Sequence, residues 1–128
     1  MRALGLALIA ALLVGCTSPK SGPTRPGAIN HIVFFKLADP SDADELIADC
    51  GRRLRAIPGV TAYSAGRHFD MGRSNVDSDY DVGVLVAFDS KQDYQGYLGH
   101  PDHLALVEQW RSRWTWIRIY DVGNDPRK

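Results

Sequence analysis

The chain has 128 residues, of which 45% are hydrophobic, and its 15 acidic and 15 basic side chains give a formal net charge of zero. About 100 residues remain once an N-terminal targeting region is set aside, which is enough for one small domain and not for two. The two charge signs are mixed along the chain and form no basic face, which excludes nucleic acid as an expected partner.

Residues 1–15 are typical of a secretory signal peptide. Residues 3–14 are apolar and uncharged, and they are too short for a bilayer core that needs about 20 residues. The sequence LVGC, which ends at Cys16, resembles the lipobox of bacterial lipoproteins, in which the cysteine is lipidated and becomes the mature N-terminus. The alternative is an ordinary signal peptide with an incidental cysteine, and we expect lipidation of Cys16.

Lipidation predicts a location in the bacterial cell envelope, with acyl chains such as palmitate anchoring the protein in a membrane. Thr17 after the cysteine favours the outer membrane, facing the periplasm, where the host has two membranes. Residues 16–28 are rich in Pro, Gly and Ser and are expected to form a flexible tether. Cys50 then has no disulfide partner, so we expect it to be buried and inert.

The domain, residues 29–128, shows the element order strand, helix, strand, strand, helix, strand. Apolar and β-branched runs predict strands over residues 29–37, 60–69, 82–88 and 114–122. The first helix is expected to begin at Ser41, with Asp44 completing a capping pattern, and to stop at Pro58. The second helical region begins at Ser90 with the same pattern and is broken in two at Pro101.

This order matches the split βαβ arrangement, so we predict an α+β, ferredoxin-like fold with a four-stranded antiparallel sheet and helices on one face. The first and third strands are apolar on both faces, which would leave an exposed patch of several hundred Å² on the open face. We therefore expect a homodimer, a dimeric α+β barrel, whose apolar cavity is lined by Val33 and Phe35.

Motifs along residues 30–122 resemble those of the stress-responsive A/B barrel (Dabb) family of dimeric α+β barrels. The motifs are HIVFFKL (31–37), IPGV (57–60), DMGRSNVDSDYDVGV (70–84), FDS (88–90), YLGHPDHLALVEQW (97–110) and YDV (120–122). The resemblance implies the fold described above. For function it implies less, since the family includes stress-associated proteins, bacterial members without assigned activity and a plant polyketide cyclase branch.

In the cyclase branch, a tyrosine and a histidine at the positions of Tyr97 and His103 resemble an acid–base pair, and a histidine at the position of His31 lies beside the cavity. A further histidine of the cyclase falls where this chain has Val82. A desolvated, neutral imidazole can take a proton from a carbon acid, and a phenol can polarise a carbonyl. We therefore consider Tyr97, His103 and His31 as candidate catalytic residues.

A structural interpretation of YLGHPDHL is complete by itself, and we prefer it to the catalytic one. Pro101 at the first helical position makes His100 the N-cap, Asp102 suits the helix dipole, and His103 would pack locally. His100, Asp102 and His103 are expected to diverge too much to bind a metal.

The calcium-loop pattern of Asp77, Asp79 and Asp81 has Val82 and Phe88 where the turn glycine and the bidentate Glu belong, so we expect no metal site. No cofactor is expected either. Two functions stay open: an envelope-anchored binding or stress-associated module that holds a small hydrophobic molecule, and an acid–base enzyme of the cyclase or lyase type.

Overall fold

The computed structural model describes residues 27–123, so the predicted signal peptide, Cys16 and most of the predicted tether lie outside the described residues. The elements follow one another as β1 (Ile29–Leu37), η1 (Pro40–Asp42), α1 (Ala43–Arg53), β2 (Val60–Gly66), β3 (Val82–Phe88), α2 (Lys91–Leu98), α3 (Pro101–Trp110) and β4 (Trp114–Gly123). Gly27, which was expected in the tether, is buried, and its carbonyl accepts a hydrogen bond from Asn30 Nδ2 at 3.0 Å.

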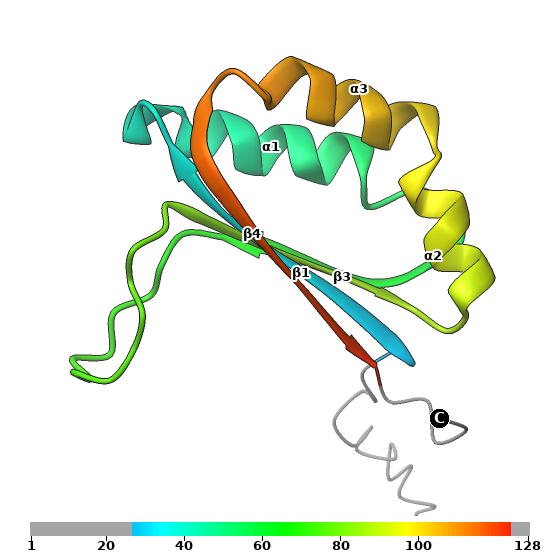
Figure 1. Cartoon of the computed structure of the whole chain (residues 1–128), viewed down its shortest axis with the longest axis horizontal. Helices are drawn as coiled ribbons and strands as arrows, with labels where there is room; N and C mark the ends of the chain where they lie inside the picture. The colour runs from blue at the N-terminus through cyan, green and yellow to red at the C-terminus, as the bar shows by residue number, and fades with distance from the viewer. Residues whose placement is uncertain (1–26, 124–128) are drawn as a thin grey trace, which may run out of the picture.

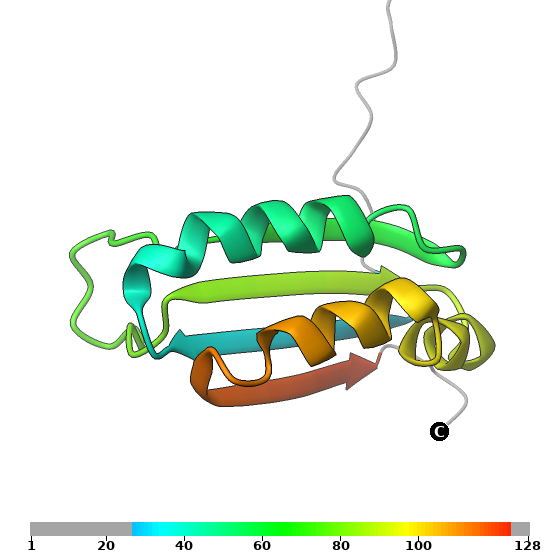
Figure 2. The same cartoon turned by 90° about the horizontal axis from the view of Figure 1, so that it is seen from above.

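The four strands form one antiparallel sheet in the order β2-β3-β1-β4, with β1 and β3 at its centre. Helices α1 and α3 run side by side across one face, and α2 covers one end of the same face (Figures 1 and 2). No helix of residues 27–123 lies on the opposite face (Figure 1). The predicted α+β, ferredoxin-like fold with helices on one face is therefore confirmed.

The hydrophobic core lies between the sheet and the helices. Leu46 and Cys50 of α1, Trp110 of α3 and Val84 of β3 are among its buried members. Cys50 is fully buried, and desolvation, helped by the neighbouring charge of Asp49, raises the pKa of its thiol to about 12. A thiol in this environment is inert at neutral pH, as the sequence predicted. None of the helices within residues 27–123 is long and apolar enough to cross a membrane.

The first helix begins differently from the prediction. Asp39, not Ser41, supplies the cap, because its carboxylate accepts a hydrogen bond from the Ser41 amide at 2.9 Å and starts the short 3-10 turn η1. The N-cap of α1 is Asp42, which makes no side-chain capping bond, so the predicted Ser41 capping pattern is wrong. The second predicted cap is confirmed, since Ser90 Oγ accepts from the Asp93 amide at 3.0 Å.

The second strand is shorter than predicted and ends at Gly66 instead of Phe69. Gly66 pairs with Gly83, near the first residue of β3, so residues after Gly66 have no strand beside them. They belong instead to a long connection, residues 67–81, that extends away from the helices (Figure 1).

Val33 and Phe35 do not line a cavity between two protomers, as the expected dimeric barrel required. Val33 and Phe35 point towards the helices and are only 8% exposed, whereas Ile32 and Phe34 lie on the open face. His31 shares the face of Val33 because side chains alternate along a strand. The cavity lined by Val33 and Phe35 therefore lies beneath the helices of one protomer, and not on the open face of the sheet.

Candidate functional site

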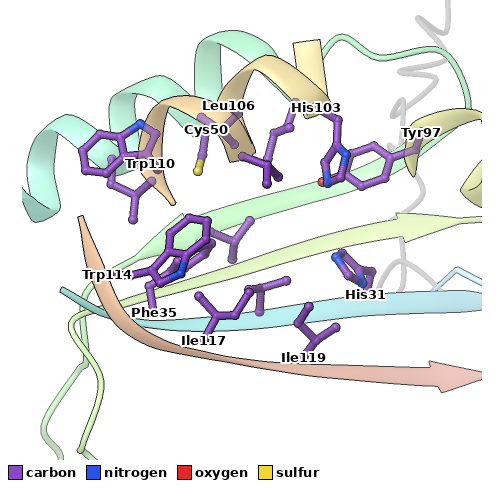
Figure 3. Close-up of a pocket in the computed structure, with 15 residues that line it drawn as sticks. His31, Phe35, Cys50, Tyr97, His103, Leu106, Trp110, Trp114, Ile117 and Ile119 are labelled. Carbon is purple, nitrogen blue, oxygen red and sulfur yellow. The ribbon is translucent and has the colours of Figure 1, made fainter. Parts of the chain in front are cut away.

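A small cavity lies between the sheet and the helices, with a free volume of about 80 Å³. Figure 3 shows side chains from the strands below and the helices above converging on it. The residues that line it are His31, Val33, Phe35, Leu46, Cys50, Leu54, Val84, Tyr97, His103, Leu106, Val107, Trp110, Trp114, Ile117 and Ile119. Ile117 and Ile119 belong to the edge strand β4 and are themselves exposed, so the cavity opens along this edge.

The structure brings all three candidate residues to this cavity. Tyr97 from the last turn of α2 lies with its ring centroid 4.7 Å from that of His103 and 6.0 Å from that of His31. His103 descends from the first turn of α3, and His31 rises from β1 on the opposite wall (Figure 3). The predicted cavity residues Val33 and Phe35 lie on the same wall as His31.

Tyr97 is the most deeply buried polar side chain of the site. It is 1% exposed, and its hydroxyl has no hydrogen-bond partner among residues 27–123. Burial of the ring, with smaller contributions from Cys50 and neighbouring tyrosines, raises the pKa of its phenol. The hydroxyl therefore stays protonated at neutral pH and is available as a hydrogen-bond donor.

His100 is the N-cap of α3 and His103 lines the cavity, the positions that the sequence predicted. His100 Nδ1 accepts a hydrogen bond from the Asp102 amide at 3.2 Å and is the N-cap of α3. His103 Nδ1 lies 3.1 Å from the Leu98 carbonyl, which can only accept, so Nδ1 carries the proton and Nε2 keeps a lone pair. Burial lowers the pKa of His103 despite the opposing effect of that carbonyl, which favours the neutral imidazole.

His31 is 4% exposed and belongs to a hydrogen-bonded cluster that sequence reasoning missed. Its Nδ1 lies 2.8 Å from Asp121 Oδ1 and 2.8 Å from the Tyr94 hydroxyl. The Tyr94 hydroxyl in turn donates to both Asp121 oxygens, at 2.9 and 3.1 Å. Burial, followed by the bond to Asp121, raises the pKa of Tyr94 and keeps it protonated.

The sequence contained a signal for Asp121, although not for its partner. Asp121 has the same phase in β4 as Ile117 and Ile119, so a carboxylate interrupts a strand face that otherwise looks towards the core. Only the register between β1 and β4, which places Asp121 opposite His31, shows what this carboxylate contacts.

The arrangement offers polar atoms in an otherwise apolar cavity and no metal-binding cluster. No group of three potential metal-ligating side chains occurs in the described part of the chain. The acidic triplet of the 67–81 connection is bound to sheet cations, since Asp79 and Asp81 lie 3.3 and 3.6 Å from Lys36 Nζ and Asp77 lies 3.4 Å from Arg118 Nη1. The phenol and imidazoles of the cavity are groups that form hydrogen bonds and transfer protons.

Comparison with known proteins gives a family match over residues 29–124, to the stress responsive A/B barrel domain. Olivetolic acid cyclase from Cannabis sativa is 27% identical over 104 residues, which cover 79% of this chain and 99% of the cyclase. An uncharacterized protein of Streptomyces coelicolor is 33% identical over 98 residues, which cover 70% of this chain and 93% of that protein.

Solved structures agree with the fold. A Dabb family protein from Mesorhizobium loti with a ferredoxin-like fold is 28% identical, with a TM-score of 0.62 over 73% of this chain and 93% of that one. A ferredoxin-like protein from Thermobifida fusca, 23% identical, has a TM-score of 0.63 over 74% of this chain and 89% of its own. It is one of several structural relatives that are dimeric.

Proposed function

Because the chain belongs to the stress-responsive A/B barrel (Dabb) family, we propose that it binds a small, mainly apolar molecule in the cavity beneath its helices. The observation that carries this proposal is the hydroxyl of Tyr97, which belongs to a side chain only 1% exposed, lines the cavity and makes no hydrogen bond within the described chain. A ligand oxygen in the cavity would accept a hydrogen bond from this hydroxyl.

The size of the cavity limits the ligand. Pockets for drug-sized molecules span roughly 300–1,000 Å³, whereas this cavity has about 80 Å³. Trp110 and Trp114 occupy much of its wall at the end far from Tyr97 (Figure 3). The ligand is therefore a compact molecule of few heavy atoms, or one whose apolar part extends past Ile119 along the exposed edge of β4.

Acid–base catalysis is the second candidate, and the state of His103 favours it. A neutral imidazole with a free Nε2 can remove a proton from a carbon next to a carbonyl, while the Tyr97 phenol stabilises the resulting oxyanion by donating a hydrogen bond. The similarity to olivetolic acid cyclase supports this function. Val82, which occupies the position of a further cyclase histidine and is fully buried in the core, argues for a different substrate.

Small molecules released by denaturing the purified protein, identified by mass spectrometry, test the binding function. We expect a compact compound with the unmodified protein and at least a tenfold smaller amount with Tyr97→Phe or His103→Ala. Tyr120→Phe, on the exposed open face, is the matched control and should retain it. Equal retention by all variants would disprove the site. Turnover of the released compound that is lost in both site variants would select the enzyme.

Dimer formation through the open face is part of the proposal. Ile32, Phe34 and Leu85 lie on this face, and Tyr120 and Val122 of β4 are about half exposed there. An apolar sheet face without helices needs a cover, and the dimeric ferredoxin-like relatives support a second copy as that cover. Light scattering of the purified protein should give twice the chain mass.

Lipidation of Cys16, after removal of residues 1–15, completes the proposal and would anchor the module in the bacterial envelope. It is supported by the apolar run and the LVGC sequence. Intact-mass analysis of protein extracted from membranes of the native host should show acyl chains on Cys16. Recovery of a mature chain without acyl chains would overturn this part of the proposal and leave the cavity function untouched.

A further inference from the structure

We propose that Tyr94 is a positioning residue for His31: together with Asp121 it fixes His31 as the Nδ1–H tautomer, so that the cavity contains a second imidazole whose Nε2 accepts hydrogen bonds. The inference deepens the proposed function and rests on it for its significance. Tyr94, Asp121 and His31 all lie outside the YLGHPDHL motif. The tautomer of His31 determines which hydrogen-bonding groups a ligand needs.

The hydrogen-bond geometry determines where the proton on His31 lies. An ionised carboxylate only accepts, so Asp121 must receive hydrogens from both of its neighbours. The Tyr94 hydroxyl uses its single proton on Asp121, and its oxygen is then an acceptor only for Nδ1. With Asp121 Oδ1 and the Tyr94 oxygen both 2.8 Å away, an unprotonated Nδ1 would face two lone pairs. The proton therefore resides on Nδ1.

Tyr94 is held firmly enough to act as a positioning group. Its ring stacks on Phe88 with centroids 5.0 Å apart and lies 5.2 Å from the His31 ring. Asp121 alone is a weaker constraint, because its side chain is 48% exposed and water competes for its oxygens. The Tyr94 hydroxyl contacts both partners and so couples the exposed carboxylate to the buried ring.

The groups that face His31 come from three other elements. Asp121 lies on β4, Tyr94 and Tyr97 lie on α2, and His103 lies on α3, near enough to influence the imidazole electrostatically. Among them only Asp121 and Tyr94 contact Nδ1. Neither Tyr97 nor His103 makes a hydrogen bond to His31, so Nε2 has no partner within residues 27–123.

The consequence is a cavity with two acceptors and one donor. His31 and His103 each have Nδ1 occupied as a donor, by Asp121 with Tyr94 and by the Leu98 carbonyl, and each keeps an Nε2 lone pair when its imidazole is neutral. Tyr97 provides the donor. A neutral molecule with two hydroxyl or enol O–H groups, one for each imidazole, beside a carbonyl satisfies this set, whereas a carboxylate anion supplies no hydrogen for either imidazole.

Side-chain ¹⁵N NMR of the ligand-free protein tests the inference, because the two ring nitrogens of a neutral histidine have well separated shifts that identify the tautomer. We expect Nδ1–H for both His31 and His103 in the unmodified protein. In Tyr94→Phe, which removes one oxygen, the Nε2–H fraction of His31 should rise several-fold, and Asp121→Ala should raise it further. His103 should stay Nδ1–H in every variant.

Tyr63→Phe is the matched control, since Tyr63 also packs against the core and its buried hydroxyl has no hydrogen-bond partner within the described chain. It should leave His31 unchanged. An Nε2–H form of His31 in the unmodified protein, or a Tyr94→Phe spectrum identical to that of the control, would overturn the inference. If Asp121→Ala does not fold, Tyr94→Phe decides alone. The NMR measurement uses ligand-free protein, so its result does not depend on whether the protein binds a ligand. A failure of this inference can therefore be distinguished from a failure of the binding function.

Discussion

The two faces of strand β1 differ in how their polar and apolar groups are used. On the helix-covered face, His31, Val33 and Phe35 are less than one-tenth exposed, and the single polar group among them is fully engaged at Nδ1. On the open face, Ile32 and Phe34 are partly exposed beside Tyr120 of β4. One set of alternate residues in β1 therefore lines the cavity inside the protomer, and the other set forms part of the surface proposed for dimer formation.

This difference teaches that apolar character alone does not identify a binding cavity. Both faces of β1 are apolar, and the cavity with polar groups directed into it lies on the covered face. On the open face, the cations Lys36 and Arg118 are paired with the 67–81 connection. Substitutions on the two faces should consequently affect different measurements.

The largest effect is expected where the covered face is most tightly packed. Trp110→Ala removes a fully buried indole and its hydrogen bond to Asp49, and it should lower the free energy of unfolding by about 3–5 kcal/mol. Trp116→Ala, on the half-buried edge of the open face, should lower it by less than half as much. Denaturant unfolding at one fixed protein concentration measures both. Equal losses would contradict the distinction between the faces.

Assembly should depend on the open face instead. Leu85→Asp places a charge in the centre of the proposed interface and should weaken the dimer at least about 100-fold, since leaving a buried charge unpaired costs about 3–5 kcal/mol. Leu104→Asp, on the exposed side of α3, is the matched control and should remain dimeric. Sedimentation over a range of concentrations distinguishes them. A dimer that survives Leu85→Asp would locate the interface elsewhere.

The buried carboxylate of Asp49 predicts a pH dependence of stability. Desolvation opposes its ionisation, but hydrogen bonds from Trp110 and Arg52 outweigh that effect and hold its pKa below the usual 3.8. Because the folded pKa is the lower one, this contribution is complete above the unfolded pKa and is lost as the pH falls through the folded value. Acid unfolding should therefore begin below about pH 4.

Asp49→Asn should lower the free energy of unfolding by about 1–3 kcal/mol at pH 7. The difference in this free energy between the variant and the unmodified protein should become smaller in acid. Asp44→Asn, on the exposed side of the same helix, should change stability by less than about 0.5 kcal/mol. Denaturation series at pH 7 and pH 3 measure the effect. A penalty for Asp49→Asn that is the same at both pH values would show that the charge is not responsible.

The smallest effect concerns the helix cap. His100→Asn keeps a good N-cap and should cost well under about 1 kcal/mol, while His100→Ala should cost more because nothing then accepts from the Asp102 amide. Thermal unfolding resolves the two. Ligand retention should be unchanged in both variants, and its loss in His100→Asn would mean that the roles of His100 and His103 have been exchanged.

The elements of the fold could be predicted because their periodicities are local. Apolar and β-branched runs marked the strands, and a stripe that includes Leu46 and Cys50 marked the first helix. The face of β1 that meets the helices could not be predicted, because His31, Val33 and Phe35 form a set as apolar as Ile32 and Phe34. Only the packing of helices on the sheet distinguishes the two sets.

The contacts of the candidate site also include some that the sequence could predict and some that it could not. Tyr97 and His103 lie six residues apart on either side of a helix break, so their proximity is local and the motif suggested it. His31 and Asp121 are 90 residues apart, and their contact depends on the register of β1 with β4. Tyr94 joins them only through the placement of α2 over one end of the sheet.

The position of Asp121 limits how long its hydrogen bond to His31 persists. The residue lies near the end of the β1–β4 ladder, whose last pair joins Ile29 to Gly123, and within residues 27–123 β4 is an edge strand that pairs with β1 alone. Strand ends open locally at a small fraction of the free energy that global unfolding requires. Each opening would carry the carboxylate away from His31 and allow its proton to exchange, so the lifetime of the tautomer should equal the interval between openings. Amide hydrogen exchange at Val122 would report that interval.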